Sequence, residues 1–156
     1  MNDMLAEETV TAEYSIVTVD GKVLQAEKKE ALLPANASVC ILNADVSKLH
    51  FDPEKTVLRA RLLNDGAVIA ESRYFFAPFR KMVNRAPNIT CRNEPMGSNQ
   101  WKVTLRSPSF VWLVHLAEPD GTVYSDNDFD LWPGETRMVT VTTDQKAFKP
   151  DFSFVR

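Results

Sequence analysis

Apolar and polar residues alternate with a period of two over much of this chain, and turn dipeptides interrupt the alternation at short intervals. Near the N-terminus, polar residues separate Val10, Ala12, Tyr14 and Ile16. Because successive side chains of a strand point to opposite faces of a sheet, this spacing predicts half-buried strands. Stretches with helical spacing are scarce. The pattern therefore predicts an all-β fold.

Two hairpins are expected in the first half of the chain. The dipeptide DG at 20–21 supplies the turn of the first hairpin, and NDG at 64–66 supplies the turn of the second. Between them, the apolar stretch Ser38 to Leu42 predicts a short strand. The segment from Asp45 to Pro53 is too short for a substantial helix, so it is interpreted as a crossover loop.

The second half has the same strand pattern after an interruption. Residues 77–87, APFRKMVNRAP, have a proline near each end and no sustained alternation, as is typical of a linker. Beyond it, WKVTL predicts a half-exposed strand, FVWLVHL a central strand, and RMVTVTT a strand of β-branched residues. We therefore expect two tandem immunoglobulin-like β-sandwich domains, at 1–80 and 88–156, joined by a linker at 81–87.

Composition and charge narrow the function classes. With 156 residues, 44% hydrophobic and 25% charged, the chain has the profile of a globular protein with a real core. A net charge of −3 with interspersed signs gives no long basic stripe, so no nucleic-acid partner is expected. Residues 1–11 lack the regions of a signal peptide, and no apolar run is long enough to span a bilayer. No membrane partner is expected, and the localisation stays unknown.

The cysteines and histidines do not form a recognisable metal or catalytic motif. Cys40 and Cys91 lie far apart, each in an expected strand, so buried free thiols are favoured over a disulfide. His50 and His115 are the only histidines, and no serine or cysteine lies in a nucleophile-elbow context. Glu94, in CRNEPMG, is interpreted as a solvated hairpin end. We expect no catalytic residues, no cofactor and no metal.

The stretch SDNDFDLWPGE, at 125–135, is the strongest candidate for chemistry, because it holds four carboxylates. Asp126, Asp128 and Asp130 have the spacing that begins an EF-hand calcium loop. That loop needs a glycine where this chain has Leu131, and a glutamate where it has Arg137. An extended strand explains the same residues, with the aspartates on one face and Phe129 and Leu131 on the other.

Three tryptophans raise the alternative of a carbohydrate-binding surface. Trp101 and Trp112 lie in apolar strands, so both are expected in the core. Trp132, beside the Pro133-Gly134 turn, is the one candidate for an exposed platform that stacks on a sugar ring. Carbohydrate is therefore kept open as a partner, with Trp132 as the substrate-binding candidate.

Several strings of the chain resemble one enzyme family. DGTVYSDNDFDLWPGE, with the preceding FVWLVHL, resembles the C-terminal immunoglobulin-like domain of β-mannosidases and related glycoside hydrolases of family 2. VLRARLLNDGAVIAESRYFFAPFRK resembles the end of the preceding sandwich domain and its exit into the linker. The chain departs from the family at Asp128, where an aromatic is usual. The first unit also starts late, which implies that its leading strand is missing.

The resemblance implies an accessory role rather than a catalytic one. The parent activity would be retaining hydrolysis of β-mannosides, performed by two glutamates on a barrel domain that this chain lacks. Taken alone, the chain is expected to be inactive and to give structural support, through contacts with the barrel and N-terminal domains of the parent or between copies in a homo-oligomer. The alternative is a stand-alone carbohydrate-binding or adhesion module.

Overall fold

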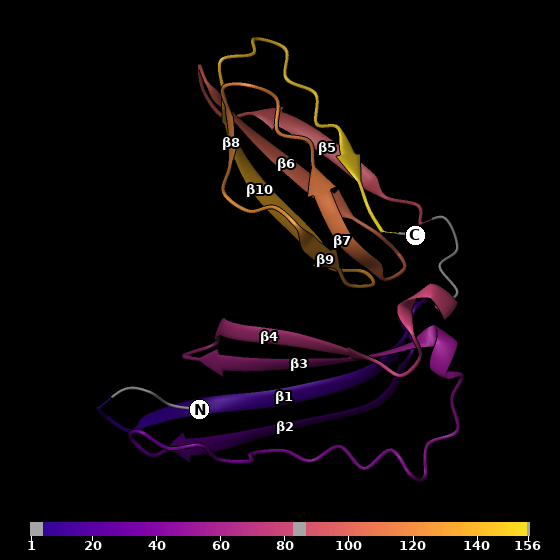
Figure 1. Cartoon of the computed structure of the whole chain (residues 1–156). Coiled ribbons are helices and arrows are strands. Elements are labelled where there is room, and N and C mark those ends of the chain that lie inside the picture. The colour runs from indigo at the N-terminus through magenta and orange to yellow at the C-terminus, as the bar shows by residue number, and fades with distance from the viewer. Residues whose placement is uncertain (1–4, 83–86, 156) are drawn as a thin grey trace. The chain divides into compact units, whose positions relative to one another are not determined.

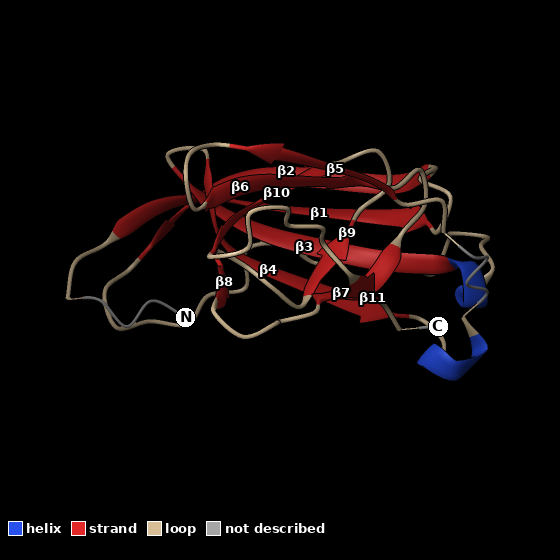
Figure 2. Cartoon of the chain, turned by 90° about the horizontal axis from the view of Figure 1, so that it is seen from above, coloured by secondary structure: helices blue, strands red, loops and turns tan. Residues whose placement is uncertain are grey.

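The computed structural model describes residues 5–82 and 87–155 and divides them into two compact units. Unit 1 comprises Met1–Thr18 and Lys22–Val83, and unit 2 comprises Val19–Gly21 and Asn84–Arg156. Strands dominate the described part of both units, where helix is limited to two short 3-10 turns (Figure 2). The expected all-β, immunoglobulin-like class is confirmed. Four residues of the linker expected at 81–87, residues 83–86, lie outside the described residues.

In unit 1, four antiparallel strands form one sheet in the order β2-β1-β3-β4 (Figure 1). Their bounds are β1 Glu8–Thr18, β2 Val23–Leu33, β3 Thr56–Asn64 and β4 Ala67–Phe75. The 3-10 turn η1, Pro53–Lys55, precedes β3, and η2, Phe79–Lys81, follows β4. Both expected hairpins are present. The turn between β3 and β4 places Asp65 and Gly66 at φ 49° and 80°, which explains the NDG sequence.

One expected strand of unit 1 is not formed. Ser38–Leu42 carries no strand pairing in the structure, although its composition predicts a strand. Cys40 is consequently exposed rather than buried, while Cys91 is half-buried, and both thiols are free. Local propensity proposed a strand here, but a strand also needs a partner for its main chain.

Unit 2 contains two antiparallel sheets. One has the order β5-β6-β10-β8, and the other has the order β11-β7-β9. The bounds are β5 Thr90–Pro95, β6 Gln100–Arg106, β7 Val111–Leu116, β8 Thr122–Tyr124, β9 Phe129–Leu131, β10 Thr136–Thr143 and β11 Phe152–Ser153. Figure 1 labels β5 to β10 of these sheets. This is the two-layer arrangement that the alternation predicted for residues 88–156.

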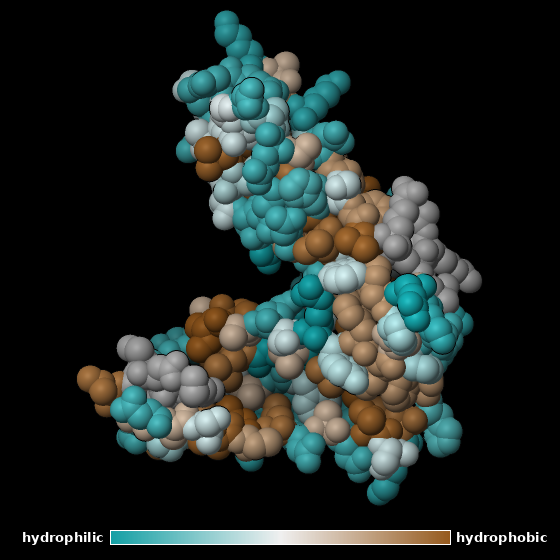
Figure 3. Space-filling model, viewed as in Figure 1, coloured by the Kyte–Doolittle hydropathy of each residue, from teal (hydrophilic) through white to brown (hydrophobic). Residues whose placement is uncertain are grey.

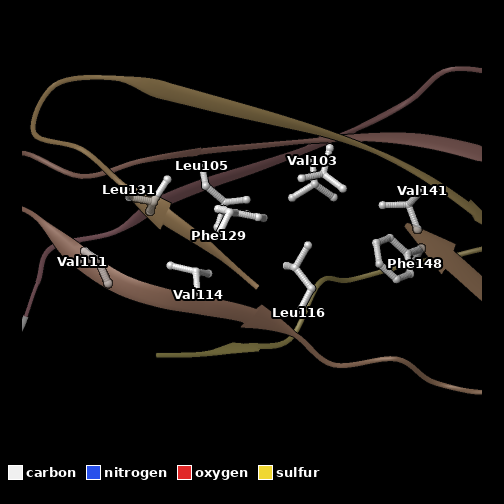
Figure 4. Packing of buried hydrophobic residues seen from close by; sticks show 10 residues of the cluster. Val103, Leu105, Val111, Val114, Leu116, Phe129, Leu131, Val141 and Phe148 are labelled. Atoms are coloured by element: carbon white, nitrogen blue, oxygen red, sulfur yellow. The ribbon is translucent and has the colours of Figure 1, made fainter. Parts of the chain in front are cut away.

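The core of unit 2 lies between its two sheets (Figure 4). Val103 and Leu105 of β6 are fully buried, as are Val139 and Val141 of β10. From the other sheet come Val111, Val114 and Leu116 of β7 with Phe129 and Leu131 of β9, and the loop residue Phe148 completes the cluster. Inward residues of facing strands thus interdigitate, and this core positions the acidic stretch.

No helix within residues 5–82 and 87–155 combines the length and apolar character that crossing a membrane requires.

Candidate functional site

The acidic stretch connects three strands of unit 2. It leaves β8 at Ser125, passes through β9, and ends at Gly134, whose φ of 78° permits the turn into β10. Phe129 and Leu131 are buried, as alternation predicted. The strand is shorter than expected, because Asp128 has a φ of 57° and interrupts the extended backbone just before Phe129. Aspartate tolerates this conformation better than most side chains.

Asn127 acts as a substitute for a strand backbone. Its Oδ1 accepts a hydrogen bond from the Leu116 N–H at 2.7 Å, and its Nδ2 donates to the Leu116 carbonyl at 2.9 Å. The same amide nitrogen donates to Glu118 Oε1 at 2.8 Å. A main-chain residue of a neighbouring strand would make the same donor and acceptor pair. The Asn127 side chain therefore continues the pairing of β7 beyond the reach of β9.

Asp130 holds an irregularity in the opposite strand. β7 has a bulge between Val111 and Val114, and Leu113 within it has a φ of 51°, which is unusual for a large side chain. The Leu113 N–H has turned away from a regular ladder and donates to Asp130 Oδ1 at 3.1 Å. The carboxylate thus satisfies a half-buried main-chain donor.

The remaining polar side chains of the stretch also have partners. Asp128 Oδ1 lies 2.9 Å from His115 Nδ1, and both side chains are about half exposed. Asp126 forms an ion pair with Arg137, whose guanidinium carbon lies 5.1 Å from the centre of the Phe129 ring. The Ser125 hydroxyl oxygen accepts from the Thr140 N–H at 2.9 Å. Each partner belongs to a different strand position, so the three aspartates bind separate groups.

This geometry argues against the calcium interpretation. A calcium site needs six to eight oxygen ligands converging on one point. Here the carboxylates of Asp126, Asp128 and Asp130 diverge to Arg137, His115 and the Leu113 N–H. Within the residues that the structure describes, no group of three or more His, Cys, Asp or Glu side chains is placed to hold a metal.

Trp132 does not offer an exposed face. Only 4% of its surface is exposed, and its ring centre lies 4.7 Å from that of Phe110 in a tilted contact. The expected exposed platform is therefore wrong in geometry, because the indole packs onto a neighbouring ring instead of projecting past the turn. Its sugar-binding role stays a prediction. Trp101 and Trp112, expected in the core, are half-buried, and Trp101 packs against the core cluster.

Glu94 and His50 both lie at exposed positions. Glu94 forms an ion pair with Lys102 on the adjacent strand at 2.6 Å, and the hydrogen bond from Lys102 lowers the pKa of the Glu94 carboxyl. Its side chain is 54% exposed, in agreement with a solvated strand end. His50 lies on an exposed loop of unit 1.

Two of the contacts around this stretch have no signal in the sequence pattern. The Tyr124 hydroxyl donates to the Ala117 carbonyl at 2.6 Å, and burial raises the pKa of this phenol. The pairing of Asn127 with Leu116 was also unforeseen. The polar side of an expected strand usually faces water, so nothing in the alternation shows that an amide there will return to the main chain.

Two family models match the chain. A model described as "Mannosidase Ig/CBM-like domain" matches residues 1–81, and a model described as "Ig-fold domain" matches residues 85–154. Among curated proteins, Beta-mannosidase B of Aspergillus flavus and Beta-mannosidase B of Aspergillus oryzae are each 31% identical over 90 residues. These alignments cover 58% of this chain and 11% of each relative. The chain thus spans a small part of the relatives' length.

Solved structures agree with the fold. Beta-D-mannosidase from Dictyoglomus thermophilum matches with a TM-score of 0.78 and 22% identity, covering 99% of this chain and 19% of that chain. The exo-chitosanase CsxA of Amycolatopsis orientalis matches with a TM-score of 0.60 and 17% identity, covering 98% of this chain and 23% of that chain. The chain belongs to the mannosidase Ig/CBM-like domain family, and its two units are similar to the C-terminal immunoglobulin-like domains of β-mannosidase-like proteins of glycoside hydrolase family 2.

Proposed function

We propose that this chain is a non-catalytic accessory region of a β-mannosidase-like glycoside hydrolase and that it supports the parent enzyme structurally. The observation that carries this proposal is that the polar side chains of the acidic stretch bind groups of neighbouring strands. Asn127 and Asp130 form hydrogen bonds with main-chain groups of β7. Asp126 pairs with the Arg137 guanidinium, and Asp128 contacts the His115 imidazole. The richest cluster of carboxylates thus serves to join strands.

The parent activity in this proposal is retaining hydrolysis of β-mannosides. Such a reaction needs two carboxyl groups about 5 Å apart on opposite sides of the scissile bond, one as nucleophile and one as acid/base. In the resembled family, a barrel domain outside these two units provides that pair. Rigid sandwich domains attached to the barrel stabilise it by burying its apolar surface.

The proposal is tested on the native protein. An antibody raised against this chain is used to precipitate the protein from its source, and the precipitate is assayed with p-nitrophenyl β-mannoside. We expect a polypeptide several times longer than 156 residues that carries the activity, while the isolated chain shows no turnover. A precipitated polypeptide near the length of this chain, or turnover by the isolated chain, contradicts the proposal.

The supporting role has its own test in that longer enzyme. Asn127→Ala should lower the temperature of thermal inactivation by several degrees, because it loosens unit 2, while kcat and KM at 25 °C stay unchanged. Asn99→Ala is the matched control, since the Asn99 side chain makes one exposed hydrogen bond to Asp144 at 3.4 Å. A change in KM with Asn127→Ala and no change in inactivation temperature would assign the region to substrate binding.

Sugar binding at Trp132 is tested by titrating the isolated chain with manno-oligosaccharides and following tryptophan fluorescence. Because the Trp132 ring is buried against Phe110, we expect no quenching at millimolar sugar. Saturable quenching that Trp132→Phe abolishes would favour the carbohydrate-binding alternative.

A further inference from the structure

Asp-Gly pairs occur three times in the chain, at residues 20–21, 65–66 and 120–121. In such a pair the main-chain nitrogen of the glycine can attack the aspartate side chain, because glycine has no Cβ to hinder the approach. The product is a five-membered succinimide ring. A fold permits or prevents this reaction through the freedom that it leaves to each turn. The surroundings of the three turns therefore decide which of them reacts.

The Asp65-Gly66 pair lies at the tip of the β3–β4 hairpin, which is weakly held. The β3–β4 ladder is irregular between Leu62 and Leu63, and two residue pairs close the hairpin beyond that point. The edge strand β4 is exposed over residues 67–74. Figure 3 shows apolar surface at the tip of this hairpin. A short exposed ladder beyond an irregularity opens more readily than the interior of a sheet.

The local geometry of this turn leaves the attacking nitrogen accessible. Asp65 has a φ of 49°, a left-handed conformation that is unfavourable for a residue with a Cβ, so rotation out of it is favoured. Among the main-chain hydrogen bonds of the described residues, none is donated by the Gly66 N–H. A Cβ placed on Gly66 would meet no described atom within 4 Å beyond its chain neighbours. The Gly66 nitrogen is therefore open to the Asp65 side chain.

The other two Asp-Gly pairs have closer surroundings, and both glycines belong to unit 2. A Cβ on Gly21 would lie 2.8 Å from the Pro133 Cβ, so the first turn is packed against a ring that restricts its rotation. At the third turn, Asp144 Oδ2 lies 3.8 Å from the position of a Cβ on Gly121. A nearby carboxylate disfavours the deprotonated glycine nitrogen that attacks. The turn at Asp65 has neither restriction.

We propose that Asp65 is the site at which the folded chain forms isoaspartate. The Gly66 nitrogen bonds to the side-chain carboxyl carbon of Asp65, and the carboxyl hydroxyl leaves with the N–H proton as water. Water then opens the ring at the main-chain carbonyl, so that the chain runs through the former side chain and an α-carboxylate is released. Water is the only reagent, and the mass is unchanged. This α-carboxylate is the group that S-adenosylmethionine-dependent isoaspartyl methyltransferases esterify, so the modified turn is a substrate for that class of enzyme.

The test incubates the full chain at physiological temperature and measures isoaspartate by tryptic digestion and mass spectrometry with electron-transfer fragmentation. Cleavage after lysine and arginine places the three Asp-Gly pairs in separate peptides, residues 1–22, 62–73 and 107–137. We expect isoaspartate to form in the 62–73 peptide roughly fivefold faster than in either of the others. In urea, where the fold no longer distinguishes the turns, the three rates should agree within about twofold. Methyl transfer from S-adenosylmethionine by an isoaspartyl methyltransferase measures the product independently.

Two variants localise the reaction. Asp65→Glu keeps the charge but lengthens the side chain, so that ring closure would need a six-membered ring, which forms far more slowly. The product in the 62–73 peptide should therefore disappear. Asp120→Glu is the matched control, since it makes the same change at an exposed turn of unit 2 and should leave the rate in the 62–73 peptide unchanged. Circular dichroism confirms that both variants fold.

Three results overturn the proposal. The first is an absence of isoaspartate from the 62–73 peptide of the folded chain after a time in which the chain in urea has reacted. The second is an equal rate in the three peptides of the folded chain, because the fold would then not select the site. The third is a product in the 62–73 peptide that Asp65→Glu leaves unchanged. The accessory role proposed above does not depend on any of these results.

Discussion

Unit 2 buries its alternating strands between two sheets, whereas the described part of unit 1 has one sheet with a partly covered apolar face. Val103 and Leu105 on β6 of unit 2 are fully buried, while Leu58 and Leu62 on the comparable inner strand of unit 1 are half-buried. The alternation in sequence is similar in the two strands. Alternation thus shows which face of a strand is meant for burial, but not whether another layer covers it.

The largest difference should appear when equivalent leucines are truncated. Leu105→Ala leaves a cavity in a closed core and should lower the free energy of unfolding of unit 2 by about 3 kcal/mol. Leu62→Ala removes a half-buried side chain, so the free energy of unfolding of unit 1 should fall by only about 1 kcal/mol. Urea unfolding followed by tryptophan fluorescence reports unit 2, which contains all three tryptophans, and far-UV circular dichroism reports both units.

Equal losses in the two variants would remove the contrast between a closed core and an open face. They would show that Leu62 is covered in solution as closely as Leu105 is.

A second prediction concerns how unit 2 joins its sheets. Asn127→Ala removes four hydrogen bonds, one of them from the Asp128 N–H, and leaves the N–H and C=O of the buried Leu116 without the amide. The free energy of unfolding of unit 2 should therefore fall by about 2 to 3 kcal/mol. Asn99→Ala, which loses one exposed bond, should cost less than about 0.5 kcal/mol. The midpoint of the fluorescence transition in urea measures both. Similar midpoints for the two variants would mean that Asn127 is not a strand connector.

A third, smaller effect should depend on alkaline pH. Burial raises the pKa of Tyr124 above its ordinary value of 10.0, so the folded state favours the neutral phenol. The resulting stability is fully present below pH 10 and is lost as pH rises through the raised pKa. Tyr124→Phe should lower the free energy of unfolding of unit 2 by about 1 kcal/mol at pH 7, because the hydrogen bond to Ala117 is lost. The free energy of unfolding of the variant should also fall less steeply above pH 10. An unchanged alkaline decline in the variant would contradict this assignment.

The smallest effect is expected at the surface ion pair of unit 2. Asp126 and Arg137 are partly exposed, so Asp126→Asn should change the free energy of unfolding by less than about 0.5 kcal/mol. Raising the salt concentration to 0.5 M should remove most of that difference. A loss above 1 kcal/mol that persists at high salt would indicate that Asp126 positions Arg137 over the Phe129 ring.

The sequence predicted the structure correctly where a feature depends on local residues alone. The hairpin at 64–66 followed from glycine and aspartate in a positive-φ turn, and the burial of Phe129 and Leu131 followed from alternation. The prediction of a strand at Ser38–Leu42 was wrong. Strand propensity depends on the local sequence, whereas strand formation also needs a partner elsewhere in the chain. The exposure of Trp132 was wrong because its contact with Phe110, 22 positions earlier, leaves no trace in either local pattern.

The candidate site was less predictable than the fold. The bonds of the three aspartates to Leu113, His115 and Arg137 depend on distances between strands, which the sequence pattern does not contain. The irregularity at Leu113 changes which residues of β7 face β9, and the alternation in the sequence does not predict it.

The dependence of unit 2 on one amide side chain has a consequence for how the protein ages. Spontaneous hydrolysis of the Asn127 amide replaces a hydrogen-bond donor with a carboxylate oxygen, at a point where the Leu116 carbonyl lies 2.9 Å away and Glu118 Oε1 lies 2.8 Å away. The new oxygen would face two acceptors, one of them charged, and would repel both. Deamidation of Asn127 alone would therefore separate the end of β7 from the segment that contains Asn127, although no residue within a strand would have changed.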